Sequence, residues 1–498
     1  MAIPEQRAAR LPSLCAATRR GLAALLLVAG CSAAAAFTGV RVLHAFDSVD
    51  GAYPQGRLVM GSDGRLYGTT YAGGRAASGL GALFSVSTAG TFTLLHAFDG
   101  SDGNSLSFGV VQGADGQLYG TTPQGSISIG PLSTNYGGTF FRSDLNGQLT
   151  TLHRFLPADL ATQGYEPGAV VDGGDGFFYA ASRSGGASNA GALLRLAGDG
   201  TVTLLHSFIP GQASYPTGRI TRLADGSLVG ALRYNSAGAD KGALFRWSAG
   251  AGAGAGMAVL RDFNGPDGTY PGGLLSEAAD GSLYGVTGQG GASDAGTVFR
   301  LAPGGALTTL HAFNGLDGAG PVDGLAWGPD AQLYGLTFSG GSDNGGTLFR
   351  IGPAGGLQTL HLLAPTGGTK PAAAPLLAAD GMLYATATAY GGAPSAVGSV
   401  FAFDTTVQQP AALLMEKTCY NEFNTCFRPI NVGVGGRYTV SWASANLTQC
   451  TASGAWSGAR AASGRLDVTA TRRGVYTYRL NCSGPGGNRQ AAVSVTVG

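Results

Sequence analysis

The chain has 498 residues, a formal net charge of +1 and only 12% charged residues. This length allows two or three domains with large cores, and the near-neutral balance excludes the basic surface of a nucleic-acid-binding protein or a polybasic membrane patch. Glycine is abundant, at 86 residues, yet 44% of the chain is hydrophobic. Only 5 of the 29 acidic residues are Glu, which favours helices, whereas Asp favours turns. Composition therefore predicts many short strands joined by tight turns.

Residues 1–36 are predicted to be a signal peptide. Arg19 and Arg20 precede the apolar run 21–29, which has the length of a signal-peptide core and is too short to span a bilayer. The run ends in Val28-Ala29-Gly30-Cys31, which resembles a bacterial lipobox in which Cys31 is acylated. Cleavage before Phe37 is the alternative. Both predict export, as an outer-membrane or periplasmic lipoprotein or as a secreted protein.

Three short motifs recur in the same order along residues 40–404. In the unit 296–337 they are Gly-Thr-Val-Phe, Leu-His-Ala-Phe and Leu-Tyr-Gly. Each motif occurs seven times, and the Leu of the Leu-His-x-Phe motif falls at positions 43, 95, 152, 205, 260, 310 and 360. A period near 50 residues, built from short strands and turns, is typical of a β-propeller.

Each repeat contains four predicted strands, A to D, and a tight Asp-Gly turn joins A to B in most repeats. The array opens with a lone strand D at 40–46 and closes with strands A, B and C before residue 404. The first strand can therefore complete the last blade, which removes the open edges of a linear array. The predicted fold is all-β: a seven-bladed β-propeller, followed by a small Ig-like β-sandwich at 411–498.

The segments 66–70, 118–122 and 296–299 read Leu-Tyr-Gly-Thr-Thr, Leu-Tyr-Gly-Thr-Thr and Gly-Thr-Val-Phe. They resemble the GloVer-type tandem repeat, a family of exported bacterial repeats, over roughly residues 40–404. The resemblance implies export and varied surface-anchoring ends, and no particular activity. The fourth repeat departs most from the pattern, with Val229 in place of Tyr and Arg261 in place of His.

All six histidines lie in the Leu-His-x-Phe motif. This repetition favours a structural role in which each ring hydrogen-bonds a neighbouring turn or strand, and Arg261 at the seventh position supports a donor role. No histidine remains for a Ser-His-Asp triad or a clustered metal site. We therefore predict no catalytic residue, metal or cofactor. The Asp and Asn side chains of the Phe-[Asp/Asn]-x-x-Asp-Gly loops, such as Asp47 and Asp50, are expected to form Asx turns. Calcium binding by these loops is the alternative.

The D–A and B–C loops are the longer ones and share one face of such a blade. Binding is often carried by loops of this kind on a rigid scaffold. Tyrosine rings there could contact a sugar or a peptide. The alternative for each position is an ordinary solvated loop residue. The candidate ligand-binding residues are Arg75, Tyr136, Arg183, Tyr234, Asn235, Lys241, Asp294, Asp343 and Tyr390. Glu166 and Glu277, the only glutamates of the ring, are expected to be solvated rather than to act as general acids.

The C-terminal region has alternating strand patterns, as in Tyr476, Tyr478 and Leu480. Its four cysteines allow three disulfide connectivities. Cys419–Cys426 and Cys450–Cys482 are favoured, because the first pair flanks a short loop and the second joins two strands. Trp442 and Trp456 are expected in the core. The region resembles the Ig-like modules of exported bacterial proteins, although Trp456 follows Cys450 more closely than in antibody domains.

We interpret the chain as an exported, non-catalytic binding scaffold for a glycan, a peptide or an envelope protein. No nucleic-acid partner is expected, and membrane contact is expected only through a lipid anchor. A propeller lyase or hydrolase acting on an extracellular polymer is one alternative. A purely structural envelope protein is the other.

Overall fold

The computed structural model describes residues 40–74, 79–125, 137–249, 256–364, 368–389, 397–404, 412–419, 431–445, 447, 449–461, 463–484 and 487–498, and for a few of these, including Cys419, it describes the backbone only. The predicted signal peptide with Cys31 lies outside these residues, as do Arg75, Tyr136, Tyr390 and Cys426. Among the described residues, no helix has the length and apolar character needed to span a bilayer.

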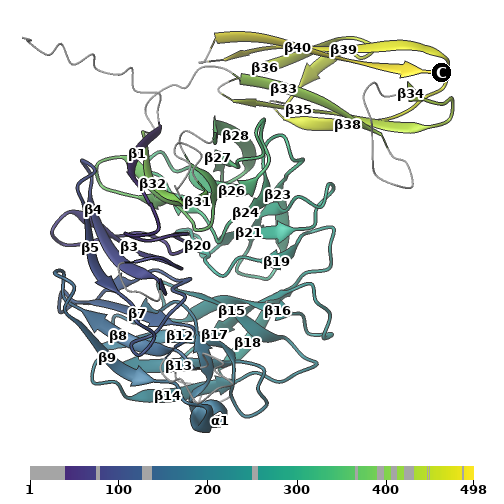
Figure 1. Ribbon diagram of the computed structural model, residues 1–498. Coiled ribbons are helices and arrows are strands. Elements are labelled where there is room, and N and C mark those ends of the chain that lie inside the picture. Colours follow the sequence, from purple (N-terminus) through teal and green to yellow (C-terminus); the bar gives the residue numbers. More distant parts are fainter. Residues whose placement is uncertain are drawn as a thin grey trace, which may run out of the picture. The chain divides into compact units, whose positions relative to one another are not determined.

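The seven-bladed propeller predicted from the sequence is confirmed: seven antiparallel sheets follow one another along the chain (Figure 1). Blade 1 comprises β2 (Val59–Met60), β3 (Arg65–Thr70), β4 (Ala82–Ser87) and β5 (Phe92–Ala97), and blade 2 comprises β6 (Val111–Gln112), β7 (Leu118–Thr122), β8 (Thr139–Ser143) and β9 (Leu149–Arg154). The short helices η2 (Pro157–Asp159) and α1 (Leu160–Gln163) follow in the connection to blade 3.

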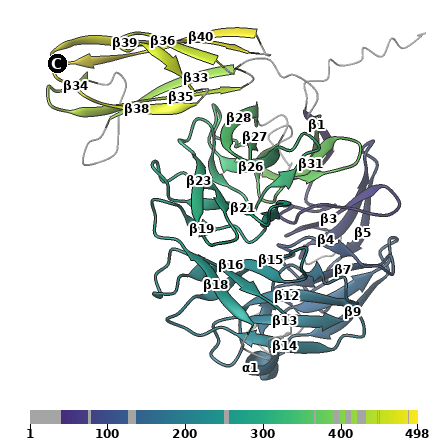
Figure 2. The ribbon, with the colours of Figure 1, turned by 180° about the vertical axis from the view of Figure 1, so that it is seen from behind.

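In blade 3 the inner strand has two parts, β10 (Tyr165–Pro167) and β11 (Val171–Asp172), and the other strands are β12 (Phe177–Ser184), β13 (Ala192–Ala197) and β14 (Val202–Ser207). Figure 2 shows β12, β13 and β14 in this order from the opposite side. Blade 4 comprises β15 (Ser214–Arg222), β16 (Leu228–Tyr234), β17 (Ala243–Trp247) and β18 (Met257–Asp262).

Blades 5 to 7 also have divided inner strands. Blade 5 comprises β19 (Thr269–Pro271), β20 (Ser276–Glu277), β21 (Leu283–Gln289), β22 (Thr297–Leu301) and β23 (Leu307–Ala312). Blade 6 comprises β24 (Ala319–Pro321), β25 (Ala326–Trp327), β26 (Leu333–Ser339), β27 (Thr347–Gly352) and β28 (Gly355–Leu362). Blade 7 comprises β29 (Thr369–Pro371), β30 (Leu376–Leu377), β31 (Met382–Ala389), β32 (Ser399–Asp404) and the N-terminal β1 (Val40–Ala45).

Blade 7 joins the two ends of the repeat array. β1 pairs antiparallel with β32, with Val40 opposite Phe403 and Val42 opposite Phe401. The purple β1 accordingly lies beside the green β32 in Figure 1. The first strand of the array is therefore the outer strand of its last blade.

A repeated hydrogen bond connects each blade to the one before it. A residue with left-handed backbone lies at the start of each inner strand and donates its N–H to a B–C loop carbonyl of the preceding blade. The seven donor–acceptor pairs are Tyr53–Val397, Ser105–Leu80, Glu166–Gly137, Tyr215–Ala190, Tyr270–Lys241, Gly320–Ala295 and Lys370–Gly345. The pair Tyr53–Val397 connects blade 1 to blade 7, so these bonds run around the whole ring.

Close packing between blades explains the glycine that precedes each strand C. Gly296 has a φ of 91°, and a Cβ there would lie 2.3 Å from the Thr287 carbonyl oxygen and 2.6 Å from Cδ of Pro321. Pro321 follows the left-handed Gly320 of the next blade. Only glycine fits this backbone conformation and this space. The glycine of the Gly-Thr-Val-Phe motif therefore lies at a contact between neighbouring blades.

The C-terminal residues form two small sheets. The first contains β33 (Ala412–Cys419), β35 (Arg437–Ala445) and β38 (Gly464–Thr469). The second contains β34 (Asn431–Val432), β40 (Gly487–Val497), β39 (Gly474–Gly484), β36 (Gln449–Gly454) and β37 (Gly458–Arg460).

The core of this sandwich contains Tyr438, Tyr478, Trp442 and Trp456, so the core placement predicted for both tryptophans is confirmed. The expected disulfide Cys450–Cys482 is present. It links β36 and β39, which are neighbours in one sheet, whereas the disulfide of antibody domains joins the two sheets. The predicted pair Cys419–Cys426 lies outside the side chains that the structure describes.

Candidate ligand-binding face

The D–A and B–C loops lie on one face of the ring, because antiparallel pairing places the start of strand A beside the end of strand B. In blade 4, Ser214 pairs with Tyr234 and Pro216 with Leu232. In blade 3, Tyr165 pairs with Ser184. The residues that begin β10 and β15 and those that end β12 and β16 therefore share this face.

A cavity of about 410 Å³ opens on this face around blade 4, lined by Arg183, Ser184, Tyr215, Pro216, Thr217, Leu232, Arg233 and Tyr270. These residues come from three consecutive blades: β12 of blade 3, β15 and β16 of blade 4, and β19 of blade 5. Two tyrosine rings and two guanidinium groups therefore line one small cavity. A mixed surface of this kind offers flat apolar contact together with charged hydrogen-bond donors.

The rings and guanidinium groups contact one another around the cavity. Tyr215 and Tyr234 meet edge to face, with centroids 5.4 Å apart, and Arg233 lies 5.4 Å from the centroid of Tyr234. Both oxygens of Asp240 accept hydrogen bonds from Arg233, at 3.1 and 3.0 Å. The Asp240 carboxylate thereby orients the Arg233 guanidinium at the edge of the cavity.

Backbone geometry also fixes the two cavity tyrosines. Tyr215 and Tyr270 have φ angles of 58° and 55°, a left-handed conformation that costs a bulky residue on the order of 1 kcal/mol. Their N–H groups donate to the carbonyls of Ala190 and Lys241 in the preceding blades. Tyr270 is 38% exposed despite its aromatic ring. The inter-blade bonds thus fix the backbone positions that carry the two tyrosine rings.

Three of the sequence-predicted residues meet around this cavity. Arg183 lines it, Tyr234 packs on the cavity residue Tyr215, and the Lys241 carbonyl accepts the N–H of Tyr270. Sequence reasoning missed Tyr215, Arg233 and Tyr270. The available signal was the Tyr-Pro pair before strand A, which recurs at 53–54, 215–216 and 270–271.

Asn235 and Asp294 serve their own loops, which makes them poor ligand contacts. Asn235 is only 9% exposed; its Oδ1 accepts the N–H groups of Ala237 and Ala239. Asp294 Oδ1 accepts the Gly290 N–H at 2.8 Å. Asp343 is exposed on the B–C loop of blade 6 and accepts a hydrogen bond from its neighbour Ser342. Arg75, Tyr136 and Tyr390 lie outside the described residues.

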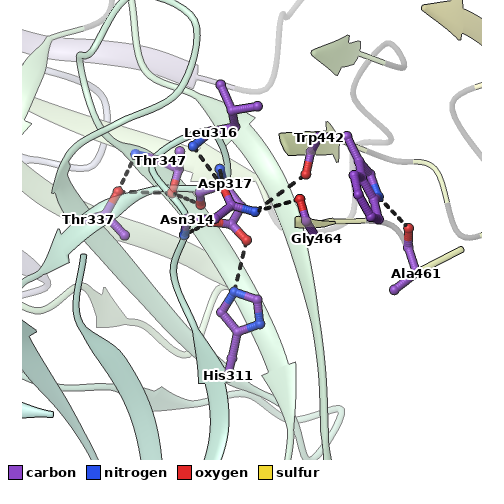
Figure 3. Close-up of polar contacts among 9 residues, drawn as sticks. All are labelled: His311, Asn314, Leu316, Asp317, Thr337, Thr347, Trp442, Ala461 and Gly464. Carbon is purple, nitrogen blue, oxygen red and sulfur yellow. Dashed lines mark hydrogen bonds and ion pairs between the residues drawn. The ribbon is translucent and has the colours of Figure 1, made fainter. Parts of the chain in front are cut away.

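In three blades the D–A loop is organised by the repeated histidine, as His44, His96 and His311 show. His311 Nε2 lies 2.9 Å from Asp317 Oδ2, and Asp317 Oδ1 accepts the N–H of Asn314 (Figure 3). The Thr347 hydroxyl donates to the Asp317 carbonyl and contacts the hydroxyl of Thr337. The loop is thus tied to β23 of blade 5, which precedes it, and to β26 and β27, the two middle strands of blade 6, which follows it.

The same pairing recurs in other blades, as His44–Asp50, His96–Asp102 and, with the histidine replaced, Arg261–Asp267. The structural role predicted for the histidine and for Arg261 is confirmed in these blades. Burial alone would raise the pKa of Asp50, but the hydrogen bonds from His44 and the Asp47 N–H, with the charge of His44, hold it below its ordinary value.

The carboxylates proposed as calcium ligands are therefore engaged by donors of the protein itself. Within the described ranges, no group of three or more His, Cys, Asp or Glu side chains is placed to hold a metal ion. The two ring glutamates also have protein partners. Glu277 accepts the Ala224 N–H at 2.7 Å, and Glu166 accepts the Ser184 hydroxyl at 3.4 Å.

The fold and its loop face define a β-propeller protein, and this fold is similar to that of an extracellular domain of known structure. The chain belongs to the Gloeobacter/Verrucomicrobia repeat family, whose pattern matches residues 32–132, 109–275 and 224–418. This confirms the resemblance seen in the sequence. No curated protein matches the chain.

Among solved structures, the chain is similar to the extracellular domain of a protein described as a hybrid two-component system, BT3049 from B. thetaiotaomicron, with 8% identity over 92% of this chain and 57% of that one and a TM-score of 0.51. It is also similar to PorZ, a surface component of the type-IX secretion system of Porphyromonas gingivalis (12% identity, 90% and 59% coverage, TM-score 0.43), and to puromycin hydrolase (14%, 81% and 61%, 0.44). The chain thus spans about three fifths of the length of these structures. At such identities the likeness shows the fold alone.

Proposed function

We propose that the protein is an exported, non-catalytic binding scaffold whose ligand, a glycan, a peptide or an envelope protein, occupies the cavity around blade 4. The observation that carries this proposal is the placement of Tyr215 and Tyr270 beside Arg183. The backbone N–H of each tyrosine donates to the preceding blade, and both residues line the cavity together with Arg183 and Arg233.

The chemistry of the cavity suits a ligand with flat apolar faces and hydrogen-bond acceptors. Tyrosine rings provide contact area with little loss of conformational entropy, and guanidinium groups bind hydroxyl, carbonyl and carboxylate oxygens. Sugars and extended peptides both offer this combination. The disulfide Cys450–Cys482 supports export, because disulfides persist in oxidising compartments.

The test is a glycan, cell-wall and peptide binding screen with the mature protein, followed by variants of the cavity. Tyr270→Ala and Arg183→Ala are expected to weaken any binding found by about tenfold or more, which corresponds to roughly 1.4 kcal/mol. Tyr53→Ala is the matched control, because Tyr53 has the same left-handed position in blade 1 and is 45% exposed but does not line the cavity. Equal binding by all three variants would contradict the proposal. Turnover of a polysaccharide in an activity panel would instead favour a lyase or hydrolase.

We also propose that the mature protein is a lipoprotein anchored through Cys31. The lipobox-like sequence Val28-Ala29-Gly30-Cys31 supports this assignment. Mass spectrometry of the mature N-terminal peptide is expected to show an acylated Cys31. An unmodified start at Phe37 would contradict it.

A further inference from the structure

A second cavity, of about 300 Å³, is lined by the inner strands of several blades. Its walls are mainly apolar, with side chains such as Leu58, Val110, Val170, Ile220, Leu274 and Leu376. These residues come from blades 1, 2, 3, 4, 5 and 7, so the cavity is the central channel of the ring. Two further lining residues are Arg57, just before β2, and Arg219, at the equivalent place within β15; both precede the other lining residues of their strands and so lie at the end of the channel nearer the D–A loops.

These two arginines interrupt the symmetry of the repeats. In each blade one residue of strand A pairs with the Tyr of the Leu-Tyr-Gly motif, or with its replacement Val229 in blade 4. Arg57 and Arg219 each lie two residues before that paired residue, so their positions are equivalent. The other five blades carry small or apolar residues there: Gly109, Ala169, Leu274, Gly324 and Ala374. A residue needed by the blade fold would recur, as the histidines do. Arg57 and Arg219 therefore serve something other than blade formation.

Arg219 is fully engaged by the protein. The residue is 9% exposed, and its Nε lies 2.9 Å from Asp323 Oδ1. Its Nη2 lies 3.4 Å from the carbonyl oxygens of Gln55 and Ser107, and the guanidinium stacks 5.1 Å from the centroid of Phe108. Asp323 therefore fixes Arg219 in a rigid position at the channel.

Arg57 differs, because its guanidinium makes no hydrogen bond to any residue that the structure describes, and its Nε is buried without a partner. Burial lowers the pKa of Arg57, the Asp323 carboxylate opposes this shift, and the Arg219 guanidinium adds to it. Two guanidinium groups thus face one carboxylate. A buried N–H donor without a partner costs free energy, and an anion bound by the guanidinium would remove that cost.

We propose that this end of the channel binds the carboxylate of a small amphiphilic ligand, with Arg57 as the principal contact, Arg219 beside it and the apolar body of the ligand in the channel. A guanidinium fork matches a carboxylate through two parallel hydrogen bonds. One excess positive charge matches a monoanion. Apolar walls with a few polar groups at one end are typical of sites for small molecules, and a phosphate ion would leave those walls unfilled.

The test uses hexanoate as the probe, measured by calorimetry on the full mature protein, with hexanamide as a neutral analogue and inorganic phosphate as a second anion. Saturable binding of hexanoate is expected, with at least tenfold weaker binding of the other two. Arg57→Met is expected to reduce hexanoate affinity at least tenfold. Arg246→Met is the control, because Arg246 of β17 belongs to the same blade as Arg219 but does not line the channel.

Several outcomes would overturn the proposal: no binding of hexanoate, phosphate binding as tight as hexanoate, or equal affinity in Arg57→Met. If Arg57→Met fails to fold, Arg57→Lys keeps the charge but loses the fork, and must still lose affinity severalfold. Tyr270→Ala should leave hexanoate affinity unchanged. The channel site and the cavity around blade 4 are thereby judged separately.

Discussion

Tyrosine of the Leu-Tyr-Gly motif performs two tasks at once. Its ring is buried between blades, while its hydroxyl donates to the Asp of the preceding A–B turn at 2.6 to 3.0 Å. The pairs are Tyr67–Asp63, Tyr119–Asp115, Tyr179–Asp175, Tyr334–Asp330 and Tyr384–Asp380. In the turn of blade 3, Asp175 also accepts the N–H of Phe177. One side chain thus ties a hairpin turn to the core.

Tyr179→Phe tests the value of this contact. Burial and the hydrogen bond to Asp175 raise the pKa of Tyr179 to about 12, against an ordinary value of about 10. Because the folded-state pKa is raised, the contribution is complete below pH 10 and is lost as pH rises through 12. The variant is expected to be about 1–2 kcal/mol less stable at neutral pH, and this difference should vanish between pH 10 and 12. Denaturant unfolding at several pH values measures it.

Tyr284→Phe is the matched control for that measurement. Tyr284 has the same position in blade 5, but its hydroxyl lies 3.5 Å from the Pro353 carbonyl oxygen, while the equivalent aspartate, Asp280, accepts a hydrogen bond from Arg300. A smaller loss at neutral pH is expected. Equal losses in both variants would show that the tyrosine–aspartate pair adds nothing beyond burial of the hydroxyl.

At the scale of the strand, the ring depends on the pairing of β1 with β32. Val42→Pro removes an N–H and constrains the backbone in the middle of β1, which should cost about 3 kcal/mol and release the two ends of the array. We expect a clear fall in the melting temperature and new proteolysis near residues 40–46. Differential scanning calorimetry and limited proteolysis measure these effects.

Val259→Pro gives the comparison, because Val259 of β18 has the same position opposite Phe245 that Val42 has opposite Phe401. Blade 4 remains covalently continuous when its outer strand is disturbed, so the fall should be smaller. An equal or larger fall in Val259→Pro would mean that ring closure contributes no more than an ordinary outer strand.

Strands B, C and D were predictable because their patterns are local: an Asp-Gly turn, a Tyr, and a Phe at fixed spacing. The division of strand A into β19 and β20 was not, because the Leu274 N–H between them donates to the carbonyl of Asp323, which belongs to the next blade. Arg183 was predicted because it lies beside a long B–C loop. Tyr215 and Tyr270 were missed, because their place at the cavity depends on contacts with neighbouring blades. Arg57 and Arg219 become neighbours only when the ring closes, so no local pattern indicates them.

At the scale of the whole chain, the hydrophobic cores divide into two groups. One cluster contains only residues between Val432 and Val497, and the other seven contain only residues of the propeller. Units with separate cores are expected to unfold in separate cooperative transitions. The disulfide Cys450–Cys482 belongs to the C-terminal core alone, which makes it a selective probe of that unit.

Replacing both Cys450 and Cys482 with Ala is therefore expected to affect one transition only. The disulfide closes a loop with a sequence separation of 32, and in the chain-entropy account its loss costs about 3–4 kcal/mol. For a domain of this size that lowers the melting temperature by more than about 10 °C. Calorimetry of the full chain should show the C-terminal transition shifted and the propeller transition unchanged. A variant is preferable to a reducing agent, which would also reduce any bond between Cys419 and Cys426. A shift of both transitions together would mean that the two cores unfold as one cooperative unit.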